Sequence, residues 1–209
     1  MNLSELIQKY LKDGYQSDTA FPRVCQDIIL YKIARTSISQ NITIKGGVVM
    51  MGISKDSRRA TRDIDLDFIK YSLSNEAIEK FIDKLNIVED GIIIKIIRNP
   101  ESLNHKDYKG KRVYIKIIDK YNNSLETKLD IGVHNDFEIE QDDFCFDLSN
   151  LNDSVSLLVN SKEQIFTEKL KSLFKYGFTS SRYKDIFDFY YLINMTSLSK
   201  DRLLKYFNI

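Results

Sequence analysis

The chain is poor in the residues that build metal–thiolate sites, disulfide scaffolds or membrane spans. Its 209 residues include two cysteines, Cys25 and Cys145, which show no metal-ligand spacing and make no disulfide framework. No apolar run approaches the length of about 20 residues that spans a bilayer. Residues 1–14 resemble an amphipathic helix without the apolar segment of a signal peptide. We therefore expect a cytoplasmic protein.

The chain also lacks a strong net charge of either sign. It has 31 basic and 30 acidic residues, which leave a net charge of +1 at pH 7. No global field therefore attracts it to nucleic acid or to membranes, and any contact with nucleic acid requires a local basic patch. The candidate patch, which is equally compatible with a solvated loop, consists of Lys55, Arg58, Arg59 and Arg62.

Two motifs whose residues could take part in catalysis lie close together in the first third of the chain. A strand-like run ends in the glycine pair Gly46-Gly47, whose backbone amides can approach a phosphate because glycine has no Cβ atom. Downstream, carboxylates alternate with apolar residues, so that a strand would place Asp63, Asp65 and Asp67 on one face. Hard divalent cations such as Mg²⁺ prefer such oxygens. Each motif alone is compatible with an ordinary turn or edge strand, but together they indicate metal-dependent phosphoryl or nucleotidyl transfer.

The polar face of a later strand supplies a third carboxylate. In the run 125–133, apolar residues occupy one face, and Asp130 lies on the other face beside Gly132. If this strand neighbours the acidic strand, Asp130 is a candidate third metal ligand. The alternative is an exposed strand aspartate. Asp119, at the end of a predicted hairpin, is a weaker competitor.

Hydrophobic periodicity predicts an α+β fold, with a mixed or antiparallel sheet, helices on one side of it and a helical C-terminal part. The strands are expected at residues 42–45, 63–68, 92–97, 111–118 and 125–133, and the helices at residues 3–14, 22–37, 48–53, 75–85, 161–176 and from about 180 and 199. The residues between 98 and 110 are expected to form a polar loop. We assign residues 1–155 to a core domain with N-terminal helices and residues 156–209 to a C-terminal helical domain.

Two features of the C-terminal part can be specified further. Ser161 and Gln164 form a capping-box pattern at the start of its first helix. The next helix, from Ser180 or Ser181, is expected to bury an apolar stripe that consists of Ile186, Tyr190 and Ile193.

Four short segments occur in a fixed order: Lys45-Gly46-Gly47, Arg59-Ala60-Thr61-Arg62-Asp63-Ile64-Asp65, Glu168-Lys169-Leu170 and Arg182-Tyr183-Lys184-Asp185. In this combination the chain resembles the AbiEii/AbiGii nucleotidyltransferase toxins of the polymerase-beta-like nucleotidyltransferase superfamily. The resemblance extends from about Thr43 to Leu192. Two departures are the long spacing of fifteen residues between Gly47 and Asp63 and the glycine at the second position of the pair, which offers no hydroxyl to a triphosphate.

The resemblance implies a polymerase-beta-like core and transfer of nucleotides from an NTP to RNA, often a tRNA acceptor end, by the toxin of a toxin–antitoxin or phage-defence system. It implies two Mg²⁺ ions, with Mn²⁺ as a substitute, held by Asp63, Asp65 and Asp130. A separately encoded antitoxin is expected without a stable complex. The implied catalytic residues are Asp63, Asp65, Asp130, Lys169 and Asp185, and the implied NTP-binding residues are Lys45, Gly46, Gly47, Arg59, Thr61 and Lys169.

Several alternatives stay open at this point. Asp188 competes with Asp185 as the functional C-terminal carboxylate. A catalytically inactive NTP- or RNA-binding regulatory module usually lacks one of the carboxylates, and all three are present here. A metal-dependent nuclease needs a water-activating base, and no histidine or glutamate is well placed for that role. The NTP and the acceptor are not specified by the sequence.

Overall fold

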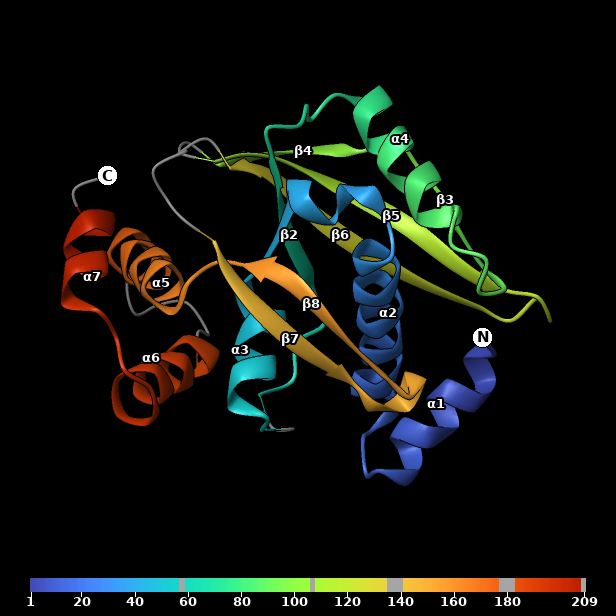
Figure 1. Cartoon of the computed structure of the whole chain (residues 1–209), viewed down its shortest axis with the longest axis horizontal. Helices are drawn as coiled ribbons and strands as arrows, with labels where there is room; N and C mark the ends of the chain where they lie inside the picture. Colours follow the sequence, from blue (N-terminus) through green and yellow to red (C-terminus); the bar gives the residue numbers. More distant parts are fainter. Residues whose placement is uncertain (57–58, 106–107, 135–140, 177–182, 208–209) are drawn as a thin grey trace. The chain divides into compact units, whose positions relative to one another are not determined.

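A computed structural model describes residues 1–56, 59–105, 108–134, 141–176 and 183–207 (Figure 1). The chain divides into two compact units, Met1–Ile139 with Asp143–Val159, and Glu140–Asp142 with Asn160–Ile209. The last strand, Asp153–Val159, runs across the boundary placed at residue 155 from the sequence, so the structural division falls at Asn160 instead. Within the described residues, no helix combines the length and the apolar content required to cross a bilayer.

The first unit contains the sheet and the N-terminal helices. Its helices are α1 (Leu3–Lys12), α2 (Ser17–Ala34), α3 (Gly46–Ser54) and α4 (Asn75–Asn86), with the 3₁₀ turns η1 (Ser37–Asn41) and η3 (Ser149–Leu151). Its strands are β1 (Ile42–Lys45), β2 (Ile64–Ile69), β3 (Ile92–Ile96), β4 (Glu101–His105), β5 (Tyr108–Asp119), β6 (Ser124–His134), β7 (Asp142–Leu148) and β8 (Asp153–Val159). The second unit contains α5 (Lys162–Tyr176), α6 (Tyr183–Met195) and α7 (Lys200–Phe207).

The eight strands of the described chain form one mixed sheet, as predicted. Its order is β3-β5-β6-β2-β1-β8-β7, and β4 pairs with β5. Strand β2 lies antiparallel to β1 and parallel to β6, whereas β5 is antiparallel to both β3 and β6. The acidic strand β2 is therefore central, with β1 on one side and the Asp130 strand on the other.

The predicted strands at 92–97, 111–118 and 125–133 are confirmed as β3, β5 and β6, but three strands were missed. The polar residues 98–110 contain β4 and the start of β5, and the segment between Gln141 and Asn160 contains β7 and β8. Strand β4 has no alternating apolar face. Strands β7 and β8 do have one, with Phe144, Phe146 and Leu148 in β7 and Val155, Leu157 and Val159 in β8, but these residues lie among Asp, Asn and Ser residues that obscure the alternation. On the other face of β7, Asp143 and Asp147 are exposed.

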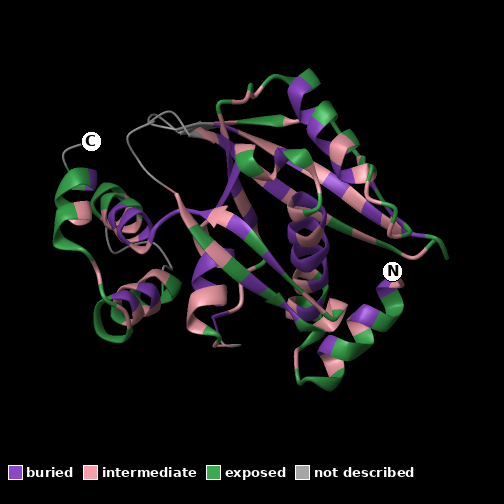
Figure 2. Ribbon diagram, in the orientation of Figure 1, coloured by how far each residue is buried: buried purple, intermediate pink, exposed green. Residues whose placement is uncertain are grey.

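The alternation in β2 separates a buried face from a polar face. Ile64, Leu66 and Phe68 are at most 1% exposed and belong to the core. Figure 2 shows the alternation of buried and more exposed residues along the strands of the sheet. The ring of Phe68 packs edge-to-face on Phe81 of α4, with 5.4 Å between ring centroids. Helix α2, which contacts β6 and β8, is buried along most of its length. The carboxylates of β2 are thereby directed away from this apolar layer.

A buried lysine joins the long helix α2 to the segment between α4 and β3. Lys32 is fully buried, and its ammonium donates hydrogen bonds to Asp90 Oδ1 at 2.9 Å and to the carbonyl of Ile92 at 3.0 Å. It also donates to the carbonyls of Leu85 and Val88. A buried charge is tolerated only when it is paired and its hydrogen-bonding capacity is used, and Lys32 meets both conditions.

We expect Lys32→Met to lower the free energy of unfolding by about 3–5 kcal/mol, because it leaves the carboxylate of Asp90 without its buried cation. Urea unfolding followed by circular dichroism measures the change. The control is Lys80→Met on the exposed side of α4, which should be within about 0.5 kcal/mol of the unchanged protein. Equal effects of the two substitutions would show that the buried ion pair contributes nothing specific.

Candidate functional site

Four charged residues form one row across four neighbouring strands of the sheet. Lys45 at the end of β1 lies opposite Asp65 of β2, Asp65 lies opposite Asp130 of β6, and Asp130 lies opposite Arg112 of β5. The two central carboxylates come from parallel neighbours, and a cation flanks each end of the row. The structure thus places Asp130 beside the acidic strand, the condition on which its candidacy as a metal ligand depended.

The glycine pair lies against this row at the point where β1 turns into α3. Gly46 has a φ of +65°, and a Cβ atom there would lie 2.5 Å from Asp65 Oδ2. A Cβ atom on Gly47 would lie 2.5 Å from the hydroxyl oxygen of Thr61. Both positions therefore require glycine, the first for its backbone conformation as well as for space. This turn brings the amino end of α3 next to the carboxylate of Asp65.

The other carboxylates on this face of β2 and its neighbours are paired with cations. Lys45 Nζ lies 2.7 Å from Asp67 Oδ1, and Lys128 Nζ lies 3.0 Å from Asp63 Oδ1. These pairs reduce the repulsion that three carboxylates on one strand face create.

Arg112 binds Asp130 through two parallel hydrogen bonds. Its Nε donates to Oδ1 at 2.8 Å, and its Nη2 donates to Oδ2 at 2.7 Å. The hydrogen bonds with Asp130 also raise the pKa of the Arg112 guanidinium. Sequence reasoning missed Arg112. The signal that could have found it is a basic residue on the polar face of the strand predicted to form a hairpin with the Asp130 strand.

The pKa of Asp65 is higher than the ordinary value for an aspartate. Burial raises its pKa to about 6, Lys45 acts in the opposite direction, and the carboxylates of Asp130, Asp63 and Asp67 raise it further. A cation bound beside Asp65 would relieve both the burial and the repulsion, because it favours the ionised form. The electrostatics at Asp65 therefore fit a divalent cation.

The predicted set of three metal ligands is only partly assembled. Among the described residues, no three Asp, Glu, His or Cys side chains converge as a metal-binding group. The pair that the sheet brings together is Asp65 and Asp130, whereas the carboxylate of Asp63 is half-exposed and faces Lys128. Asp65 and Asp130 supply the hard oxygens that Mg²⁺ prefers and could hold such an ion.

The residues of the predicted basic patch do not share one environment, since Lys55 and Arg62 are exposed and Arg59 is buried. Arg59 is buried, with 5% of its surface exposed, and Arg62 forms an ion pair with Asp18. Arg58 lies outside the described residues. Thr61 lies beside Gly47, and its carbonyl accepts a hydrogen bond of 2.9 Å from Gln26 of α2. This segment is therefore anchored to the helical layer, which positions Thr61 at the glycine turn.

In the second unit, Lys169 of α5 lies between two carboxylates of α6. Its Nζ is 2.6 Å from Asp185 Oδ1 and 2.9 Å from Asp188 Oδ2. Asp188 is fully buried, whereas the side chain of Asp185 is 17% exposed. Both candidates for the C-terminal carboxylate thus contact the same lysine, and they differ in their access to solvent. Arg182, from the same family segment, lies outside the described residues.

The orientation of α6 contradicts the prediction from its apolar spacing. Ile186, Tyr190 and Ile193 are 58–62% exposed, whereas Asp188 and Leu192 are buried. The buried face of α6 thus carries Asp188, and its ion pair with the partly exposed Lys169 offsets the cost of burying this carboxylate. Periodicity alone predicted the opposite face, since it contains no information about this ion pair.

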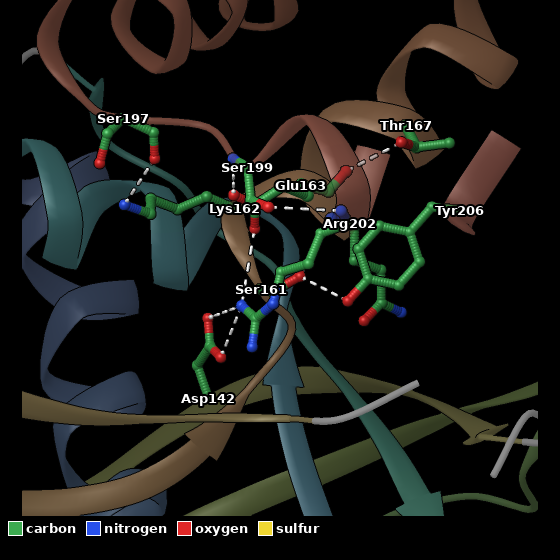
Figure 3. Close-up of polar contacts among 10 residues, drawn as sticks. Asp142, Ser161, Lys162, Glu163, Thr167, Ser197, Ser199, Arg202 and Tyr206 are labelled. Atoms are coloured by element: carbon green, nitrogen blue, oxygen red, sulfur yellow. Dashed lines mark hydrogen bonds and ion pairs between the residues drawn. The ribbon is translucent and has the colours of Figure 1, made fainter. Parts of the chain in front are cut away.

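A second polar network joins α5 to α7 and to Asp142 (Figure 3). The hydroxyl of Ser161 accepts a hydrogen bond from the Gln164 amide, which confirms Ser161 as the cap of α5. The remaining contacts run from Ser161 to Tyr206, from the Ser199 amide to Glu163, and from Arg202 to Asp142 and Glu163. The network uses buried acidic and hydroxyl groups to hold the helices of the second unit together.

Comparison with solved structures identifies the fold. A crystal structure of an antigenic nucleotidyltransferase-like protein from Paracoccidioides brasiliensis matches with a TM-score of 0.54 and 16% identity over 88% of this chain and 80% of that chain. The solution structure of the antibiotic-resistance factor ANT(2'')-Ia matches with a TM-score of 0.50 and 13% identity over 87% of this chain and 89% of that chain. The fold is that of the nucleotidyltransferases.

The family is more specific than the fold. Residues 28–208 match the family described as "Nucleotidyl transferase AbiEii toxin, Type IV TA system". Because this match covers most of the chain, the protein belongs to the AbiEii nucleotidyltransferase toxin family. A search of the curated proteins returned no match.

The raised pKa of Asp65 predicts a pH-dependent effect of Asp65→Asn. The pKa is about 6 in the folded protein and near the ordinary 3.8 in the unfolded chain, so ionisation of Asp65 opposes folding. Its contribution to stability is favourable at low pH and is lost as the pH rises through 6. We expect the uncharged variant to be more stable than the unchanged protein at pH 7.5 by up to about 3 kcal/mol, and the difference to disappear near pH 4.

Urea unfolding in the presence of a chelator at both pH values measures this difference. Asp83→Asn, at an exposed position of α4, is the control and should show no such trend. A difference that grows toward low pH would contradict the assigned direction of the Asp65 pKa.

The position of Lys169 predicts a structural effect of its removal. Lys169→Met should lower the free energy of unfolding by about 3 kcal/mol, because the fully buried carboxylate of Asp188 loses its cation. Adding Asp188→Leu to this variant should restore part of the loss, since no fully buried carboxylate is then left without Lys169, and Asp185 is partly exposed to solvent. Thermal unfolding of the single and double variants measures the coupling, with Lys171→Met as a control on the same helix. Strictly additive effects would show that the two side chains do not interact.

Proposed function

We propose that this protein transfers a nucleotidyl group from an NTP to an RNA acceptor, with the acceptor end of tRNA as the preferred candidate. The observation that carries the proposal is the pairing of Asp65 with Asp130 beside the Gly46-Gly47 turn. This places two partly buried carboxylates next to the amino end of a helix, where backbone amides and the helix dipole favour phosphate groups. Membership of a nucleotidyltransferase family supports the same chemistry.

Each part of the site has a role in this proposal. Asp65 and Asp130, with Asp63, would hold divalent cations, and we propose two Mg²⁺ ions, for which Mn²⁺ can substitute. When bound, such cations lower the pKa of the attacking hydroxyl and neutralise charge on the leaving pyrophosphate. The backbone amides of the glycine turn would hold phosphate oxygens, with the aid of Lys45, Arg59 and Thr61 from the family segments.

We further propose that the second unit contributes Lys169 and Asp185 to the reaction. The lysine ammonium is held by a buried carboxylate, that of Asp188, and by the more accessible Asp185. In this arrangement Asp188 holds the ammonium group of Lys169 in position, and Asp185 can exchange Lys169 for another partner. In this proposal Asp188 is the anchor and Asp185 is the functional carboxylate.

The biological role follows from the family. We propose that the protein acts in the cytoplasm as a toxin, paired with a separately encoded antitoxin that need not form a stable complex with it. Phage defence is a setting in which such a toxin would be used. Strong expression of active enzyme without harm to the cell would remove the toxin role and leave the transferase role.

The transferase role predicts that Asp65→Ala abolishes transfer without unfolding the protein. The purified protein is incubated with Mg²⁺, total tRNA and each radiolabelled NTP in turn, and the RNA is separated on a denaturing gel. We expect label in the RNA with the unchanged protein and a decrease of at least about 10³-fold with Asp65→Ala, equivalent to about 4 kcal/mol of transition-state stabilisation.

Asp83→Ala, at an exposed position of α4, is the matched control and should retain full transfer. Shortened RNA instead of labelled RNA would indicate a nuclease, and neither product would indicate a binding module. Either result overturns the proposal.

A further inference from the structure

Arg112 has a place in the site that the transfer chemistry described so far does not use. It terminates the row of charged residues, opposite Asp130, and belongs to the strand that forms a hairpin with β6. Its side chain is 29% exposed and that of Asp130 is 16% exposed, so the pair lies at the surface of the site and not within the core. An arginine in this position can leave its partner without unfolding the sheet.

The geometry of the pair sets Arg112 in competition with a metal ion. Both oxygens of Asp130 accept a hydrogen bond from the guanidinium, at 2.8 and 2.7 Å. A divalent cation that approaches Asp130 from the side of the guanidinium needs the same two lone pairs, and from any side it adds positive charge next to the guanidinium. Each cation therefore weakens the binding of the other at Asp130.

A displaced Arg112 would have one obvious class of ligand in this neighbourhood. The planar guanidinium donates two parallel hydrogen bonds, which match phosphate oxygens as well as they match a carboxylate. The glycine turn, which favours phosphate, adjoins Asp65, and Asp65 is the direct neighbour of Asp130 in the row. A phosphate group that enters with the metal would thus meet the guanidinium as it is released.

We propose that Arg112 is a phosphate-binding residue of this site, which Asp130 holds until a divalent cation displaces it. The exchange keeps the charge balanced in both states: Arg112 neutralises Asp130 before loading, and it neutralises phosphate afterwards. This inference rests on the proposed nucleotidyl transfer and adds to it a residue that binds the substrate. The phosphate belongs either to the NTP or to the RNA backbone, and the experiment separates these two sources.

The test measures binding, in the absence of turnover, for the unchanged protein and for Arg112→Ala. Titration calorimetry with Mn²⁺ alone should show metal affinity about tenfold higher in the variant, because the competing cation has been removed. Titration of the Mn²⁺-loaded protein with a non-hydrolysable NTP analogue, and separately with tRNA, should show one of the two affinities about tenfold lower. Loss on the analogue assigns the phosphate to the NTP, and loss on tRNA assigns it to the acceptor.

Two further variants make the result specific. Lys116→Ala removes a cation from the same face of β5, where Lys116 pairs with Glu126 of β6 at 3.7 Å. It should change neither the affinity for Mn²⁺ nor that for the NTP analogue or tRNA. Arg112→Lys keeps the charge but loses the paired hydrogen bonds. Its affinities for Mn²⁺ and for the phosphate ligand should therefore lie between those of Arg112→Ala and the unchanged protein. The lysine variant provides the same test if the alanine variant does not fold.

The opposite signs of the two effects distinguish this role from a structural one. If Arg112 only supports the fold around Asp130, its removal weakens metal binding or leaves both affinities unchanged, and either result overturns the proposal. If the protein shows no nucleotidyl transfer but Arg112→Ala raises the affinity for Mn²⁺ and lowers the affinity for the NTP analogue or for tRNA, the proposed reaction is wrong and the role of Arg112 is supported. If the unchanged protein binds neither Mn²⁺ nor nucleotide, both fall.

Discussion

The cost of gathering carboxylates on a partly buried sheet face is the constraint on which the rest of this site depends. Asp63, Asp65, Asp67 and Asp130 lie on two adjacent parallel strands, and their mutual repulsion is relieved by cations from neighbouring strands and from the strand ends. Burial, with the repulsion of the neighbouring carboxylates, raises the pKa of Asp65. A site with this balance is arranged to accept an additional cation, since one more positive charge lowers its free energy.

The topology of the sheet decides which of these charges become neighbours. The parallel pairing of β2 with β6 sets Asp65 opposite Asp130, and the antiparallel β5–β6 hairpin then sets Arg112 opposite Asp130. The close approach of the glycine turn completes the arrangement, because any side chain at Gly46 would collide with Asp65. In the second unit, Lys169 likewise neutralises the carboxylate of Asp188, which lies on the buried face of α6.

The fold could be predicted where a segment is periodic over its whole length. The strands β3, β5 and β6 and the cap of α5 at Ser161 were found because apolar alternation and a local hydrogen bond are properties of neighbouring residues. Strands β4, β7 and β8 were missed because their apolar residues are few or lie among Asp, Asn and Ser residues. Strand β7 is at an edge of the sheet, whereas β8 lies between β1 and β7. The stripe of α6 was misassigned because its apolar pattern was clear, whereas the face that is buried carries Asp188 and Leu192.

The sequence by itself determined the chemistry available to this protein: an acidic strand with Asp63 and Asp65 on one face, a glycine pair ahead of it, a later Asp130 and the family segment around Lys169. Only the tertiary structure decided which of these groups meet: Asp65 lies opposite Asp130, Arg112 binds Asp130, and Asp63 pairs with Lys128. The physical reason is that alternation along a strand specifies the face of each side chain. Its partner on the next strand depends on long-range pairing and register, which involve residues far away in the chain.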